Sequence, residues 1–259
     1  MSVSLLTSLS LAQTQVFDAA SVRRNTSGES ATNLGFQPDS GRFRASNEPL
    51  WRLIAEAYRD SHQLRRFEIV GLTGELDRKR FDVDAVPPRG PHSQDSLRGM
   101  LRDLLETRFG LAVHRESRQM PVFHLVRARP DGALGPRLQP SSVDCVSTRS
   151  GGPPPPPPPG GPRPCLMIFG GGTLSSDGMT LTNLAEMGLS RALERVVVDR
   201  TGLVGGYRWT LEWDPSGQGT GNRVPLTTAL EEQLGLKLQP STGEVSVLVV
   251  DRVTEPSDN

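Results

Sequence analysis

The sequence predicts an α+β protein in which one unit of strands and helices occurs twice in tandem, with the helices packed on mainly antiparallel sheets. Three observations lead to this prediction. Apolar stripes with helical spacing end at glycines, strand-like runs alternate between apolar and polar residues, and both features recur in register in the second half of the chain. Each half is predicted to run strand, helix, strand, strand, helix, strand, strand. Alternation such as that of residues 207–211 is typical of sheets with one solvated face, so helices are expected to cover the other face.

The helix predicted over residues 97–109 is the clearest element of the first unit. Its apolar residues recur at the spacing of one helical stripe, and they are Leu97, Leu101, Leu104, Leu105 and Phe109. Ser96 is the expected N-cap, and Gly110 is expected to end the helix. The residues after this glycine are predicted to form a hairpin with strands at 111–113 and 121–126.

The second half repeats this pattern residue by residue. The apolar positions and the stop glycine of residues 101–126 reappear 125 positions later without a gap, and Leu105 corresponds to Leu230. An upstream block, residues 41–54, reappears 131 positions later. Preserved register across two blocks predicts a duplication rather than a chance similarity of two amphipathic segments.

The composition restricts the classes of function. A chain of 259 residues is long enough for two ordinary domains. Lys+Arg and Asp+Glu are balanced at 29 each, and this zero net charge argues against a general nucleic-acid binder, which needs a cationic surface. No apolar run approaches the roughly 20 residues that span a membrane, so no transmembrane segment is predicted.

The N-terminal residues 1–15 resemble the remnant of a signal peptide. The stretch 3–12 is apolar and rich in small residues, and Ser10-Leu11-Ala12 has the small-x-small pattern of a cleavage site, although no basic region precedes it. The alternative is a weakly apolar terminus without a targeting role. We expect a periplasmic or secreted protein, and otherwise a cytoplasmic one.

A proline-rich segment separates the two predicted units. Residues 151–164 contain seven consecutive prolines, which form a stiff rod of about 20 Å and are interpreted as a spacer or loop rather than a docking ligand. The only two cysteines, Cys145 and Cys165, bracket this segment and are predicted to form a disulfide; two free thiols in a reducing compartment are the alternative. The predicted organisation is a signal remnant at 1–15, a first unit at 16–140, a linker or loop at 141–165 and a second unit at 166–259.

No catalytic or cofactor-binding constellation stands out. The chain has no Gly-x-Ser-x-Gly motif, and its glycine-rich stretches lack the spacing of phosphate-binding loops. His114, His124 and Glu116 are weak candidates for a metal site, because two histidines and one carboxylate are a known ligand set. The second unit has neither histidine, which favours solvent-facing side chains. Three carboxylates predicted on strands could act as acid and base, and they are Glu68, Asp82 and Asp84. The tryptophans are expected in the core or on a sheet face, and they are Trp51, Trp209 and Trp213.

Short blocks along the chain resemble a known family. They include 17–25, 41–43, 108–111, 198–203 and 233–238. In combination they resemble the soil-associated protein family of unknown function, which is widely expanded in soil bacteria, and the resemblance extends over nearly the whole chain. Arg24 stands where that family often has Pro. Members commonly look exported, and some carry the domain behind a membrane-bound sensor-protease region.

A weaker resemblance, in pattern alone, is to the short N-terminal domains of secretins and TonB-dependent receptors, which are extracytoplasmic interaction modules. Together the observations favour a non-catalytic binding or sensory module without a cofactor. Its partner is expected to be a protein or another envelope component. The alternative is a hydrolase-type enzyme with a site in the groove between the two repeats. A deep pocket with convergent polar residues would favour the enzyme, and an exposed sheet edge would favour binding.

Overall fold

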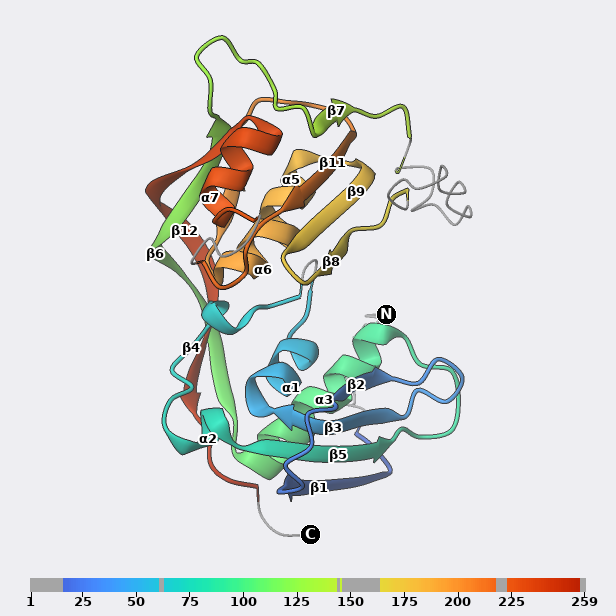
Figure 1. The fold of residues 1–259 in the computed structure, drawn as a ribbon. Helices are drawn as coiled ribbons and strands as arrows, with labels where there is room; N and C mark the ends of the chain where they lie inside the picture. Colours follow the sequence, from blue (N-terminus) through green and yellow to red (C-terminus); the bar gives the residue numbers. More distant parts are fainter. Residues whose placement is uncertain (1–15, 61–62, 144, 146–163, 218–222, 257–259) are drawn as a thin grey trace, which may run out of the picture. The chain divides into compact units, whose positions relative to one another are not determined.

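The structure is a computed structural model, and it describes residues 16–60, 63–143, 145, 164–217 and 223–256. The predicted signal remnant 1–15 and most of the proline-rich segment therefore lie outside the described residues. The fold is a mixed α+β fold, as predicted, and its described strands form three mostly antiparallel sheets (Figure 1). None of the described helices has the length and apolar character needed to cross a membrane.

The chain divides into two compact units. Unit 1 comprises Met1–Ser117 and Ser246–Asn259, and unit 2 comprises Arg118–Val245. These boundaries differ from the predicted 16–140 and 166–259, because two long strands, β6 (Ala112–Arg127) and β12 (Leu236–Arg252), each begin in one unit and end in the other. Each unit is therefore completed by part of a strand whose other part belongs to its neighbour.

Unit 1 is built on a four-stranded antiparallel sheet in the order β1-β5-β3-β2. Its elements before β6 are β1 (Ala19–Asn25), β2 (Asn33–Phe36), β3 (Phe43–Pro49), α1 (Leu50–Ala57), the short 3-10 helix η1 (Arg66–Glu68), β4 (Ile69–Val70), α2 (Glu75–Arg78), β5 (Arg80–Val86) and α3 (Gln94–Phe109). The pairing sets Val22 opposite Val83 and Phe43 opposite Ala85, so the apolar residues of three strands share one face.

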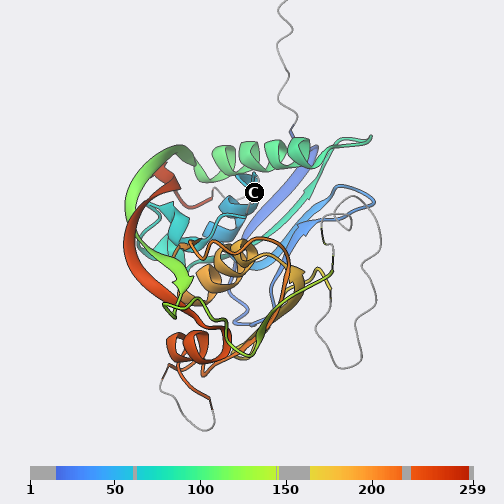
Figure 2. The same cartoon turned by 90° about the horizontal axis from the view of Figure 1, so that it is seen from above.

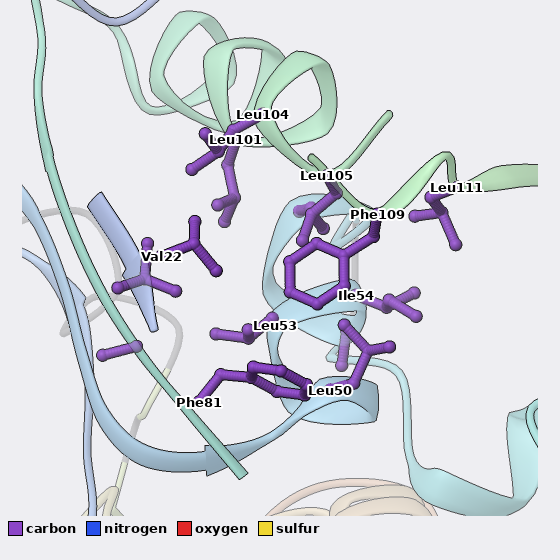
Figure 3. Packing of buried hydrophobic residues seen from close by; sticks show 14 of the residues in the cluster. Val22, Leu50, Leu53, Ile54, Phe81, Leu101, Leu104, Leu105, Phe109 and Leu111 are labelled. Carbon is purple, nitrogen blue, oxygen red and sulfur yellow. The ribbon is translucent and has the colours of Figure 1, made fainter. Parts of the chain in front are cut away.

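Helices α1 and α3 supply the other half of this core. Figure 2 shows α3 alongside the strands of the sheet. Leu53 and Ile54 of α1 are fully buried. The rings of Phe81 from β5 and Phe109 from α3 pack edge to face, with 5.0 Å between the ring centroids (Figure 3). Burial of each such side chain contributes about 1.5–3 kcal/mol. The helix begins earlier than predicted, because Ser93 rather than Ser96 accepts the capping hydrogen bond.

Unit 2 has a sheet of the same construction, in the order β7-β11-β9-β8. Its elements are β7 (Leu138–Pro140), β8 (Ile168–Gly170), β9 (Thr173–Met179), α5 (Leu181–Asn183), the π-helical η2 (Leu184–Leu189), α6 (Ser190–Leu193), β10 (Val197–Asp199), β11 (Tyr207–Glu212), α7 (Leu226–Ala229) and the π-helical η3 (Leu230–Leu234). Trp209, Leu174 and Leu230 are fully buried in its core.

The third sheet has the order β10-β6-β12-β4. In unit 1, β4 pairs in parallel with β12, with Ile69 opposite Leu248. In unit 2, β10 pairs in parallel with β6, with Val197 opposite Phe123. The predicted hairpin after Gly110 is wrong: β6 is one continuous strand. Its polar residues 115–119 contain no glycine, proline, asparagine or aspartate, the residues that most favour a turn, and they continue the extended backbone.

The tandem duplication stays a prediction from the sequence, and the structure adds a shared element order. The strands β7 to β12 follow the order of β1 to β6, with helical segments after β3 and β9 and again before β6 and β12, whereas α2, between β4 and β5, has no counterpart between β10 and β11. The proline-rich segment lies between β7 and β8, both in unit 2, rather than between the units. The structure joins Cys145 and Cys165, at its two ends, in a disulfide with a Cα–Cα distance of 5.2 Å.

Candidate anion-binding pocket

Of the residues predicted as metal candidates, His114 and Glu116 lie close together, and His124 lies ten residues further along the same strand. His114 and His124 lie on the single strand β6, because the hairpin that would have set them on facing strands is not formed. The Nδ1 atom of His114 lies 2.8 Å from Asp251 Oδ2, and its Nε2 atom lies 3.4 Å from Glu116 Oε2. In the described part of the chain, no group of three or more His, Cys, Asp or Glu side chains is arranged to hold a metal ion.

The carboxylates that were predicted on strands have structural partners, and Glu68 lies in the 3-10 helix η1 rather than on a strand. Asp84 accepts two hydrogen bonds of 2.5 Å from the Arg42 guanidinium, which lower the pKa of this carboxyl. Glu68 accepts a 2.7 Å hydrogen bond from the backbone N–H of Arg65. Trp209 and Trp213 are buried, as expected of core residues. These side chains therefore maintain the fold.

A pocket of about 570 Å³ lies in unit 1, where β1 ends and β5 begins. Its volume is within the range of small-ligand sites. Four of the lining side chains are cationic and two are acidic, and the complete lining consists of Arg24, Asn25, Thr26, Gly28, Glu29, Asn47, Glu75, Arg78, Lys79 and Arg80. The cations come from the end of β1 and from the segment that joins α2 to β5.

Asn47 forms the best-fixed part of this pocket. It is 3% exposed and has a φ of 54°, in the left-handed region that non-glycine residues rarely adopt. Its backbone N–H donates to Asp82 Oδ1 at 2.8 Å, its side-chain amide donates to the carbonyls of Glu29 and Ala31, and its own carbonyl accepts from Arg80 at 2.8 Å. Asparagine adopts this region more readily than most other residues, and these hydrogen bonds hold Asn47 in it.

Asp82 connects this residue to the opposite side of the pocket. Its two carboxylate oxygens accept hydrogen bonds of 2.9 and 3.0 Å from the side-chain amide of Asn25. Asn25 and Asn47, both lining residues, are thus tied to one carboxylate on the central strand β5. The pocket is held in shape by the sheet itself.

Lys79 is the most buried of the four cations, with a side chain 9% exposed. Its ammonium group forms ion pairs with Glu255, near the end of the chain, and with Glu75 at 3.4 Å. The hydrogen bond to Glu255 raises the pKa of Lys79, and the same bond lowers the pKa of Glu255. The positive charge of Arg24 lies near enough to lower the pKa of both groups.

Arg24 and Arg78 are the cations available to a ligand. Both are exposed, and within the described residues neither side chain forms a hydrogen bond or an ion pair. Guanidinium groups hold carboxylates and phosphates through two parallel hydrogen bonds. The arrangement therefore favours an anionic ligand.

A comparison with protein-family models gives one match, over residues 52–253, to a family described as "Protein of unknown function (DUF3738)". The chain belongs to this family. The matched segment of DUF3738 covers most of the chain, including the pocket residues Glu75, Arg78 and Arg80, whereas Arg24 and Glu29 precede it. Searches of curated proteins and of solved structures each found no match to this DUF3738 protein.

Sequence reasoning missed the pocket, although part of its signal is visible. The run Arg78-Lys79-Arg80 is a local cluster of positive charge, and Arg23-Arg24 is another. Their meeting depends on the antiparallel pairing of β1 with β5, which sets Asn25 opposite Arg80. The predicted unit did not include β1 as a partner of β5, so the two clusters could not be combined.

Proposed function

We propose that this DUF3738 protein is a non-catalytic binding protein of the cell envelope and that its pocket in unit 1 holds an anionic ligand. The observation that carries the proposal is the convergence of four cationic side chains on one pocket. Two of them, Arg24 and Arg78, form no hydrogen bond or ion pair among the described residues. The four cations outnumber the carboxylates near them, Glu29, Glu75 and Glu255, and a bound anion offsets the repulsion that remains among the cations.

Two further observations support the proposal. The lining contains no serine, cysteine or histidine and therefore no Ser–His or Cys–His pair of the kind that many hydrolases use, and this favours binding over the hydrolase alternative. The disulfide between Cys145 and Cys165 supports an extracytoplasmic location, because disulfides persist in oxidising compartments. The soil association and the secretin-like role stay predictions.

The test is isothermal titration calorimetry on the full chain with three anionic probes, which are citrate, trigalacturonate and a glutamate-rich peptide. We expect at least one to bind, with an affinity that falls as salt is added. The double variant Arg24→Ala/Arg78→Ala should weaken binding about tenfold or more, because charge-assisted hydrogen bonds contribute about 1.5–3 kcal/mol each.

The matched control is Arg89→Ala/Arg129→Ala, which removes the same charge from exposed positions outside the pocket lining. This variant should bind like the wild type. Failure of every probe to bind, or an equal effect of the two double variants, would contradict the proposal. Thermal melts of both variants show that each remains folded.

A further inference from the structure

The charges of the pocket restrict the form of the anion. Glu29 and Glu75 line the same space as the four cations. A compact anion with several charges would lie close to these carboxylates and be repelled by them. A ligand that spreads its negative groups along its length, with hydrogen-bond donors between them, can contact the arginines and the glutamates together. The mixed lining therefore favours an extended ligand.

The position of the pocket on the sheet restricts the ligand further. Strand β1 is at one edge of the sheet order β1-β5-β3-β2, and its last two residues, Arg24 and Asn25, line the pocket. Edge strands are where extended peptides add, because main-chain groups at an edge can pair with another backbone. Arg24 therefore lies both in the pocket lining and on the edge strand β1.

We propose that the pocket binds an acidic polypeptide segment in an extended conformation; this inference rests on the proposed function of the same pocket. Carboxylates of the segment pair with the guanidinium groups of Arg24 and Arg78. Its backbone N–H groups face the Glu29 carboxylate and the end of β1. The Asp82 carboxylate accepts hydrogen bonds from the backbone N–H of Asn47 and from the side-chain amide of Asn25. These bonds fix the shape of the pocket before the peptide binds, which lowers the entropic cost of binding.

The experiment compares three probes on the full chain by isothermal titration. They are an acetylated and amidated Glu-Val-Glu-Val-Glu peptide, the same peptide with N-methylated backbone amides, and trigalacturonate, which carries spaced carboxylates on a sugar backbone. We expect the unmodified peptide to bind about tenfold more tightly than either of the others, because only it offers both carboxylates and backbone donors. Arg24→Ala/Arg78→Ala should weaken its binding by a similar factor, and Arg89→Ala/Arg129→Ala should not.

The outcomes separate the two proposals. Equal or tighter binding of trigalacturonate, or unchanged binding of the N-methylated peptide, overturns the peptide inference and leaves an anion-binding pocket. If all three probes bind and Arg24→Ala/Arg78→Ala weakens none of them, both proposals are overturned. The absence of binding by every probe overturns both as well.

Discussion

Asn47 of unit 1 and Gly178 of unit 2 occupy the same position in corresponding β-bulges. Asn47 lies in the irregularity of β3 between Ala45 and Glu48, and Gly178 is the extra residue of β9 where it pairs with β11. Both have left-handed backbones, with φ values of 54° and 88°. In unit 1 the side chain at this position fixes the pocket. In unit 2 the space is already filled, because a Cβ at Gly178 would lie 2.6 Å from Cys145 Sγ.

Substitution of Gly178 by Ala should therefore destabilise unit 2. The new methyl group meets both Cys145 and Val143, and the left-handed backbone adds a strain of about 1–3 kcal/mol. Gly217→Ala is the matched control, since Gly217 has a φ of 73° and a methyl group added there would meet no atom of the described residues within 4 Å. Chemical denaturation should show a larger loss of unfolding free energy for Gly178→Ala. Equal losses would mean that crowding against the disulfide contributes nothing.

Leu105 and Leu230, paired by the repeat in the sequence, are both buried core residues, at 1% and 0% exposure. Truncation of either to Ala should reduce the free energy of unfolding by about 2–5 kcal/mol, because each leaves a cavity. Leu166→Ala, at a residue that is 49% exposed, is the control and should change stability by less than about 0.5 kcal/mol. A loss for Leu166→Ala as large as that for Leu105→Ala would contradict the core assignment. Replacement of Pro153–Pro159 by a Gly/Ser linker is predicted to leave stability nearly unchanged, but those prolines lie outside the described residues.

The disulfide predicts a chemical result that does not depend on function. Cys145 and Cys165 are the only cysteines of the chain, so denatured, unreduced protein purified from its native source should not react with a thiol reagent. Reduction should expose both thiols and lower stability by roughly 3 kcal/mol through the loss of loop closure. Stoichiometric labelling before reduction would place the protein in a reducing compartment and argue against an envelope location.

Tyr58 should ionise at unusually high pH. Burial is the largest cause that raises the pKa of its phenol, and the nearby Glu106 carboxylate, which accepts a 3.3 Å hydrogen bond from it, also raises it, so that the pKa lies at about 12. Because the folded-state pKa lies above the ordinary value of 10.0, this contribution to stability is complete below pH 10.0 and is lost as the pH rises through about 12.

The measurement is an ultraviolet titration of Tyr207→Phe, which leaves Tyr58 as the only tyrosine. Addition of Glu106→Gln should lower the pKa of Tyr58 only in part, since burial is the larger cause. An ionisation at the ordinary pKa of 10.0 in the folded protein would show that the phenol is solvated.

Helix ends were predictable from the sequence because they depend on local chemistry. Gly110 and Gly235 both adopt left-handed backbones, with φ values of 56° and 68°, and end the helical segments before β6 and β12. The N-terminus of α3 was misplaced because Ser93 and Ser96 are both acceptable caps by residue type, and only the structure shows which hydroxyl accepts the bond.

The pocket was not predictable, because it depends on register. A shift of one residue in the pairing of β1 with β5 would point Arg24 and Asn25 to the opposite faces of the sheet. The left-handed backbone of Asn47 was hidden as well, since asparagine is compatible with both extended and left-handed backbone. Charge clusters show in the sequence, whereas their convergence requires the pairing of strands.

The parallel pairing of β4 with β12 has a consequence for how the chain is made. Ile69 is synthesised long before its partner Leu248, because the whole of the second unit lies between them in the sequence. All of Arg118–Val245 emerges before the returning segment that belongs to unit 1. The second unit can therefore fold before the last strand segment of the first unit has been synthesised. The order in which the units are completed is thus the reverse of the order in which they begin. A nascent chain halted before Ser246 would carry a finished second unit behind an unfinished first one.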